Sequence, residues 1–318
     1  MSDDQAFTGS PDLPAVMGER RQLINLAYRL LGSLADAEDA VQDTYARWYA
    51  LSGSQRDAIE TPAAWLTTVA TRICLDQLRS ARVRRERYVG EWIPEPLPGP
   101  GEWRGGGSAG GGADPADRVT LDESVSMAFL VVLDAMTPAE RVAFVLHDIF
   151  GYPFAEVATI TGRTPAACRQ LASHARRRVR EAQLTPAPEA ERASVVRDFK
   201  QAWEHQDIRA IVGLLDPDAT VVADGGGLVA AALAPIQGAE QIAAYLAELA
   251  VRAPGLVLLE RTVNGQPGLI GRYQGVTVAV FAFAVAAGRI TRVWAVRNPD
   301  KLRPWLTAGP ITGGPAPN

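Results

Sequence analysis

Two kinds of hydrophobic pattern divide this chain. In residues 16–88 and 118–184, apolar side chains recur every three or four positions, which is typical of amphipathic helices. After about residue 190, two further helical stretches and a helix at 239–251 precede runs rich in Val, Ile and aromatic residues. Four strands are expected at 256–263, 269–273, 276–285 and 289–296, separated by turn pairs such as Asn264-Gly265. The pattern predicts two all-α domains followed by an α+β domain.

Sequence rich in Pro and Gly separates these domains. Residues 89–117 cannot hold a long helix, and their Gly tract predicts a flexible linker. A shorter break, LTPAPEAE, lies at 184–191. We therefore expect domains at 16–88, 118–184 and 189–305, with a disordered tail at 306–318.

The first domain is expected to contain three main helices. Gly32 should end the first, Asp36 should cap the second, and Thr61-Pro62 should begin the third. In the second helix the apolar residues face one way, while Asp39, Gln42 and Asp43 share a different face. Trp65, on the third helix, is a candidate to stack on an unpaired base, although a Trp at this spacing is more often a core residue.

A run of arginines follows the third helix. Its members are Arg79, Arg82, Arg84, Arg85 and Arg87, with a single acid, Glu86, among them. The functional interpretation is phosphate contact, because the run makes a local positive field. The alternative is a solvated helix end, where Arg favours the helix dipole.

The second domain contains a helix-turn-helix pattern. Gly162 occupies the predicted turn, Thr164-Pro165 opens the second helix, and Cys168, Leu171 and Ala175 form its expected buried stripe. Residues 163–180 hold six Arg and no acid. A helix that enters the DNA major groove needs such a mix, with some side chains for base edges and others for phosphates. The candidate DNA-contacting residues are Arg163, Arg169, Gln170, Ser173, His174, Arg176 and Arg177. An ordinary helical hairpin with a basic face is the alternative.

Composition narrows the class of protein. The net charge of −4 and the pI near 5.5 do not by themselves indicate a nucleic-acid binder, so the basic segments matter more than the average. The two cysteines, Cys74 and Cys168, have no spacing typical of a zinc site, and we expect neither metal nor cofactor. The polar N-terminus lacks the pattern of a signal peptide, and we expect a cytoplasmic protein.

The segments LADAEDAVQDTYARWYA and TPAAWLTTVATRICLDQLRSARVRRERY resemble region 2 of ECF-type RNA polymerase sigma factors. The segment MTPAERVAFVLHDIFGYPFAEVA, with the helix-turn-helix after it, resembles region 4 of that family. The resemblance implies that Asp39, Gln42 and Asp43 dock on the β′ clamp helices of core polymerase. It also implies that residues 51–82 hold unpaired −10 bases, and that region 4 reads the −35 element and meets the β flap.

The third domain resembles a SnoaL-like, NTF2-type α+β cone. Three short segments are similar to hallmarks of the SigJ-like group, in which such a domain is fused to an ECF sigma factor and controls its activity. They are Trp92, Pro94, Glu95 and Pro96 in the linker, then Asp224, Gly225, Gly226 and Gly227, and finally Asn298, Pro299, Asp300, Lys301 and Leu302. We therefore expect the third domain to grip the linker. The alternative is a plain linker and a plain Gly turn.

Two other functions remain open. One is a helix-turn-helix regulator fused to a domain that senses a small ligand. The other is weak enzymatic activity in the cone, for which Asp224 and His205, lined by Trp203 or Trp294, are the candidates. A fold alone does not confer activity, so we expect no enzyme.

Overall fold

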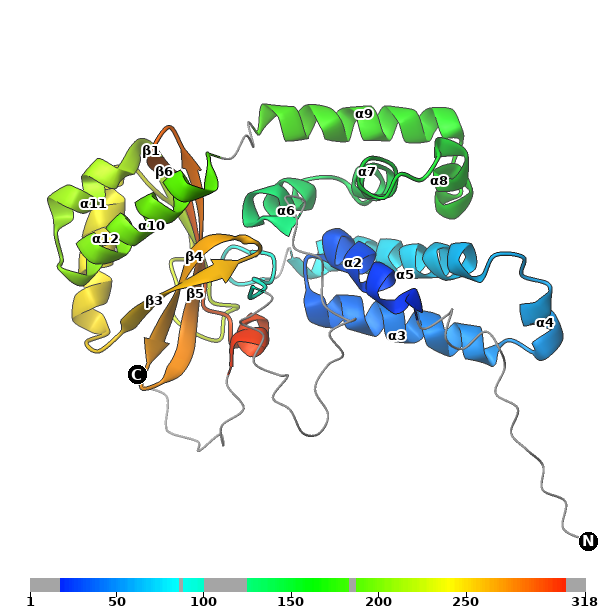
Figure 1. The fold of residues 1–318 in the computed structure, drawn as a ribbon, viewed down its shortest axis with the longest axis horizontal. Coiled ribbons are helices and arrows are strands. Elements are labelled where there is room, and N and C mark those ends of the chain that lie inside the picture. Colours follow the sequence, from blue (N-terminus) through cyan, green and yellow to red (C-terminus); the bar gives the residue numbers. More distant parts are fainter. Residues whose placement is uncertain (1–17, 86–87, 100–124, 183–186, 307–318) are drawn as a thin grey trace, which may run out of the picture. The chain divides into compact units, whose positions relative to one another are not determined.

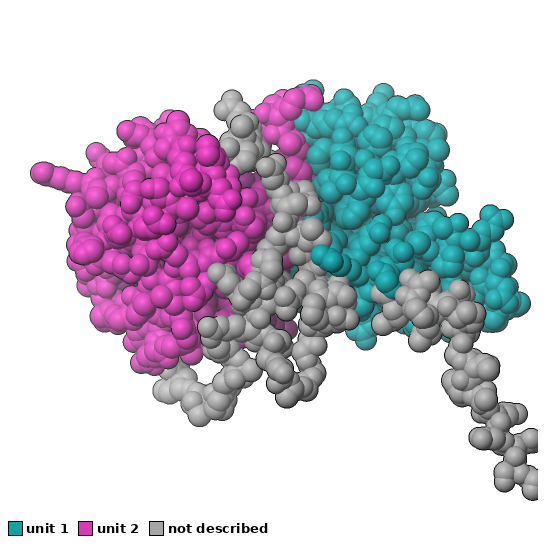
Figure 2. Space-filling model, in the orientation of Figure 1, with its two compact units in different colours: residues 1–81, 114–120, 136–177 teal, residues 82–113, 121–135, 178–318 magenta. Residues whose placement is uncertain are grey.

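The computed structural model describes residues 18–85, 88–99, 125–182 and 187–306 (Figure 1). Its contacts divide the chain into two compact units, coloured separately in Figure 2. The first unit comprises residues 1–81, 114–120 and 136–177, and the second comprises 82–113, 121–135 and 178–318. The expected disordered tail lies outside the described residues, apart from its first position, and so does the Gly tract of the linker.

The first unit begins with a helical region. Its helices are α2 (Arg20–Leu31), α3 (Leu34–Ala50), α4 (Gly53–Asp57) and α5 (Pro62–Arg85). Gly32 adopts the left-handed conformation and ends α2 as expected. The cap of α3 was expected at Asp36, but it is Ser33, whose hydroxyl accepts from the Asp36 backbone N–H. Asp36 lies instead in the first turn, where its charge favours the helix dipole.

A second helical region completes the unit. It contains α7 (Pro138–Phe144), the π-helical segment η3 (Val145–Ile149), α8 (Phe154–Thr161) and α9 (Pro165–Glu181). Gly162, at φ 66°, makes the left-handed turn between α8 and α9, which confirms the predicted helix-turn-helix. The buried stripe of α9 differs slightly from the expected one. The stripe consists of Cys168, Ala172 and Ala175, so Ala172 takes the place expected for Leu171, which is only half-buried.

The second unit is an α+β domain, as predicted. Its helices are α6 (Met127–Asp134), α10 (Glu189–Glu204), α11 (Ile208–Leu214), α12 (Ala239–Arg252) and the 3-10 segment η4 (Pro299–Trp305). Its strands are β1 (Leu215–Asp224), β2 (Ile236–Gln237), β3 (Val257–Val263), β4 (Gln266–Tyr273), β5 (Val276–Ala286) and β6 (Arg289–Val296). They form one sheet in the order β2-β1-β6-β5-β4-β3, in which only the β1–β6 pair is parallel.

Each face of this sheet has its own hydrophobic cluster, because side chains along a strand alternate between faces. On one face, α10, α11 and α12 cover a cluster that includes Phe199, Trp203, Phe281 and Phe283 (Figure 1). On the other face, Val280, Trp294 and Val296 pack with Ile93 of the linker, Met127 of α6, and Leu302 and Trp305 of η4. The linker is thus part of the core of the second unit.

Among the described residues, no helix combines the length and the apolar character that crossing a membrane would require.

Candidate functional site

The acidic face of α3 is exposed. Asp39, Gln42 and Asp43 all point to solvent, while the apolar residues of the same helix, such as Val41 and Trp48, are buried. The separation of the two faces agrees with the sequence pattern. The exposed set is available to a basic partner surface.

Helix α5 carries the other predicted contacts of this region. Trp65 is half-buried, and its ring meets that of Trp48 edge-on at 5.3 Å between centroids. Arg79 is exposed and donates to Asp76 at 3.1 Å. Arg82, Arg84 and Arg85 occupy the last turns of α5, and their side chains lie outside the described residues.

The basic face of α9 is open. Arg163 and the α9 residues Arg169, Gln170, Ser173, His174 and Arg177 are all exposed. Arg176 differs, because it is half-buried and pairs with Asp148. The helix therefore presents basic and polar side chains to solvent, while Cys168, Ala172 and Ala175 form its buried side.

Arginines tie the two helical regions of the first unit together. The Arg141 guanidinium of α7 donates to the Leu30 carbonyl near the end of α2, at 2.7 Å. In return, Arg72 of α5 donates to the Thr159 and Ile160 carbonyls at the end of α8, at 3.2 and 3.1 Å. Helix C-termini have unsatisfied carbonyls and a partial negative charge, so each arginine stabilises a helix end in the other region.

In the second unit, Asp224 at the end of β1 binds residues 88–99, which we call the linker peptide. Its carboxylate is fully buried and accepts from the Ile93 backbone N–H at 3.0 Å and from the Tyr88 hydroxyl at 2.6 Å. The Tyr88 hydroxyl in turn accepts from the Asn298 amide at 2.9 Å. Burial, together with the Asp224 charge, raises the pKa of Tyr88 well above its usual range.

Lys301 of η4 neutralises Asp224. Its ammonium lies 2.6 Å from the carboxylate and also donates to the Ile93 carbonyl. The same ammonium lies 4.1 Å from the centroid of the Trp92 ring and 5.4 Å from that of Tyr88. Aromatic faces attract cations, so Lys301 holds the linker by its rings as well as by its backbone.

Beyond Ile93, the linker peptide runs to the free edge of the sheet. The Trp305 indole donates to the Pro96 carbonyl at 2.8 Å. Leu97 makes two bonds to Asn264, one through each backbone group, at 3.0 and 2.8 Å. The Gly99 N–H then donates to the Thr262 carbonyl at 3.1 Å, so this end of the linker extends the sheet beside β3. We call the surface formed by Asp224, Asn264, Asn298, Lys301 and Trp305 the linker seat.

The Gly segment after Asp224 is shaped by close contacts. A Cβ on Gly225 would lie 2.3 Å from the Val229 carbonyl, and one on Gly226 would lie 2.4 Å from the Asn298 amide. Gly226 also donates its N–H to Asp224 at 3.0 Å. Gly227, at φ 72°, lets Val89 of the linker come close. Only glycine fits these positions without displacing the seat.

The predicted regulatory residues do not all meet. Pro94, Glu95 and Pro96 are buried and Trp92 is half-buried, and Leu302 packs in the core behind them. Pro299 and Asp300 are instead exposed, and Asp300 pairs with Arg303. They begin η4 and thereby place Lys301.

Sequence analysis missed three members of the site. In the sequence, Tyr88 stands at the end of a basic helix, Asn264 is the first residue of a hairpin turn, and Trp305 is the last residue of the expected third domain. The Asn264 amide also donates to the Val125 carbonyl ahead of α6 at 2.9 Å. The Asn-Gly pair gave a signal for the turn, but none for these contacts.

The structure does not bring together the candidate catalytic residues of the cone. Asp224 and Trp294 lie on the linker side of the sheet, whereas Trp203 packs among Phe199 and Phe281 on the helix-covered side. His205 is exposed at the end of α10. In the described part of the chain, no three His, Cys, Asp or Glu residues group closely enough to hold a metal ion.

Comparisons with known proteins agree across nearly the whole chain. The family models "Sigma-70 region 2" and "Sigma-70, region 4" match residues 15–84 and 126–179. The ECF RNA polymerase sigma factor SigJ of Mycobacterium tuberculosis is 38% identical over 296 residues, covering 89% of this chain and 90% of SigJ. The probable ECF sigma factor SigI of the same species is 34% identical and covers 92% and 96%. The crystal structure of SigJ matches with a TM-score of 0.71 and 33% identity, over 92% of this chain and 98% of that one.

Proposed function

Because this chain belongs to the ECF family of RNA polymerase sigma factors, we propose that its third domain controls promoter use by holding the linker between regions 2 and 4. The chain binds core polymerase and promoter DNA as members of that family do.

We assign polymerase binding to the exposed acidic face of α3. Asp39, Gln42 and Asp43 would meet the β′ clamp helices, where negative charge suits a basic surface. The double change Asp39→Arg with Asp43→Arg should lower affinity for core enzyme. The matched control is Asp198→Arg, an exposed acid on α10. Equal affinity of both variants would contradict this assignment.

We assign duplex recognition at −35 to the exposed face of α9, and single-strand contact at −10 to α5, including the arginines of its last turns. A recognition helix needs side chains for base edges beside others for phosphates, and Arg169, Gln170 and Arg177 supply both. Arg169→Ala should weaken binding to a −35 duplex, whereas Arg209→Ala, an exposed arginine of the third domain, should not. Equal losses would point to non-specific charge attraction.

The two elements are about 25 base pairs apart, or roughly 85 Å at 3.4 Å per base pair. In the first unit, however, Arg72 of region 2 touches the α8 carbonyls of region 4 directly. One such closed unit cannot span both elements. The interface includes polar groups, such as the Tyr152 hydroxyl on Thr67, which suits surfaces that separate. Engagement of the promoter by both regions therefore requires them to part.

The observation that carries the regulatory proposal is the burial of the linker peptide against the third domain through Asp224 and Lys301. A tether that is held at one end limits how far two tethered modules can separate, and so changes their joint affinity for two sites. In vitro transcription with core enzyme should therefore change on Trp92→Ala and on truncation after residue 190. Unaltered transcription with both variants would refute third-domain control while leaving the sigma function intact.

A further inference from the structure

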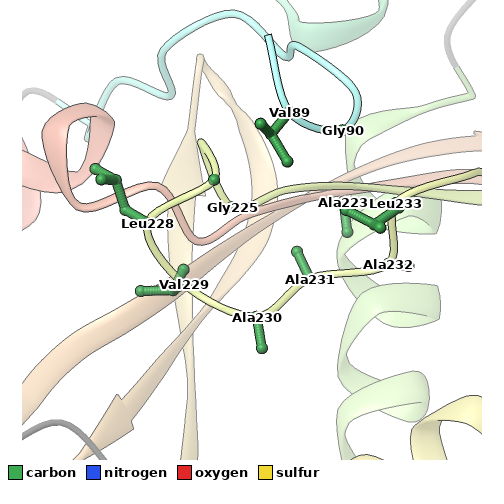
Figure 3. A pocket seen from close by; sticks show the side chains of 11 residues that line it. Val89, Gly90, Ala223, Gly225, Leu228, Val229, Ala230, Ala231, Ala232 and Leu233 are labelled. Carbon is green, nitrogen blue, oxygen red and sulfur yellow. The ribbon is translucent and has the colours of Figure 1, made fainter.

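A cavity of about 420 Å³ lies where the linker peptide enters its seat (Figure 3). Val89 and Gly90 of the linker form one wall. Ala223, at the end of β1, and the loop between Gly225 and Leu233 form the rest. The cavity is thus shared between the segment that is held and the domain that holds it.

The chemistry of the lining is uniform. Every lining residue is Gly, Ala, Val or Leu, so the side chains offer neither charge nor a hydrogen-bonding group. The charged pair of the seat, Asp224 and Lys301, is buried nearby and satisfied by its own partners. A charged ligand would find no counter-charge among these side chains, whereas an apolar ligand would bury its surface against them.

The rim of the cavity exposes large apolar side chains. Val89 is 55% exposed, Leu228 is 63% exposed and Leu233 is 69% exposed. Val89 of the linker lines the same cavity as Leu228 and Leu233, which both belong to the loop that follows β1. Gathered exposed apolar residues of this kind mark binding sites more often than single ones do.

We propose that this cavity binds a small, uncharged, mainly hydrocarbon molecule, which tightens the hold of the third domain on the linker. The volume falls within the range of roughly 300–1,000 Å³ found for small-molecule sites. A protein partner would instead require about 800 Å² of surface, far more than this rim presents. The inference rests on the proposed function, since it names a ligand class for the same linker seat.

The direction of the effect follows from the geometry. A ligand in the cavity touches Val89 and Gly90 only while the linker is seated, so it binds the seated state better than the released one. By linkage, it stabilises the seated state by the same factor. The molecule would therefore act as an effector of promoter use without touching polymerase or DNA.

The test uses N-phenylnaphthylamine, an uncharged apolar fluorophore, titrated into the full-length protein. We expect saturable binding that is roughly fivefold weaker or more in Val89→Ser, which removes apolar contact from one wall. Val276→Ser is the matched control, because Val276 is 52% exposed on the same domain but lies away from the cavity. Ala231→Phe, which places a ring in the cavity, should abolish binding, and Val89→Ser keeps the test decisive if that variant does not fold.

Coupling is read separately, by hydrogen exchange of residues 88–99 with and without the fluorophore. The Ile93, Leu97 and Gly99 amides all donate to the third domain, so their exchange reports release of the linker. The fluorophore should slow this exchange in the wild type, and in Val89→Ser the same slowing should require a roughly fivefold higher concentration. Absence of saturable binding, equal binding by Val89→Ser and Val276→Ser, or unchanged exchange would each overturn the inference. Failure of third-domain control is distinct, because it would appear as unaltered transcription with both Trp92→Ala and the truncation after residue 190, even if the fluorophore binds.

Discussion

Replacing Lys301 with Met tests the linker seat at its charged centre. The substitution Lys301→Met keeps an unbranched apolar side chain but removes the ammonium that contacts Asp224, the Ile93 carbonyl and the Trp92 ring. Asp224 is then left as a fully buried carboxylate without a counter-charge. The seated state should lose stability relative to the released state, in which the carboxylate can reach water.

The magnitude follows from the environment of Asp224. Breaking a buried ion pair by removing one partner costs about 3–5 kcal/mol. The lower end applies here, because the carboxylate keeps three donors from Tyr88, Ile93 and Gly226. About 3 kcal/mol corresponds to a shift of roughly a hundredfold in the seating equilibrium.

Hydrogen exchange of the linker peptide measures this shift directly. The protected amides of residues 88–99 should exchange roughly a hundredfold faster in Lys301→Met, while those of β5 keep their protection. The sequence supplies a matched control, since Lys200 is its only other lysine. Lys200 pairs with Glu204 one turn away on α10, a contact worth about 0.5 kcal/mol or less, so Lys200→Met should leave the linker unchanged.

Two results would refute the reasoning. Linker exchange that is unchanged in Lys301→Met would mean that the ion pair does not hold the peptide. Faster exchange throughout β5 as well would mean that the pair supports the domain as a whole. In the second case the linker would have no separate equilibrium to regulate.

Three further predictions address single contacts. Trp305→Phe removes the indole donor to the Pro96 carbonyl and should destabilise the seated linker by about 1 kcal/mol, so the linker amides should exchange faster. An unchanged exchange rate would contradict the contact. The buried Cys74, whose pKa is raised to about 12 by burial, and the buried Cys168 should both resist thiol reagents at mildly alkaline pH until the protein is unfolded, and rapid reaction of the native protein would be inconsistent with the core. The pKa of Tyr88 is raised when the linker is seated, whereas released Tyr88 ionises near pH 10. Seating of the linker should therefore be constant below about pH 10 and weaken above it, as followed by near-UV circular dichroism. Release of the linker at lower pH would count against the Tyr88–Asp224 bond.

Local signals in the sequence predicted much of this fold because they act over a few residues. Gly32 and Gly162 mark helix ends by their left-handed conformation, and Thr61-Pro62 marks a helix start. The hairpin turn at Asn264-Gly265 follows the same logic, with both residues at positive φ. Each of these features depends on the residue itself more than on distant partners.

The linker seat could be predicted only in part, because its bonds join residues far apart in the chain. Tyr88 and Asp224 are 136 positions apart, and no periodicity connects them. The resemblance supplied Asp224 and Lys301 as hallmarks, but Asn264 and Trp305 carry no such mark. The sequence pattern also could not predict the role of Pro299 and Asp300, because these residues act by starting η4 and not by contact with the linker.

The route of the linker has a practical consequence for dissecting this protein. The compact third domain is assembled from three separate stretches of chain, 88–99, 125–134 and 187–306, so no single cut releases it whole. A fragment that begins after residue 190 would lack Ile93 and Met127, and would present the apolar side chains of Val280 and Trp294, with the edge of β3, to solvent. Bare strand edges next to apolar patches promote self-association. Fragments meant to represent this domain should therefore carry the linker peptide and α6 as added segments, because self-association of a shorter fragment would not reflect a property of the whole protein.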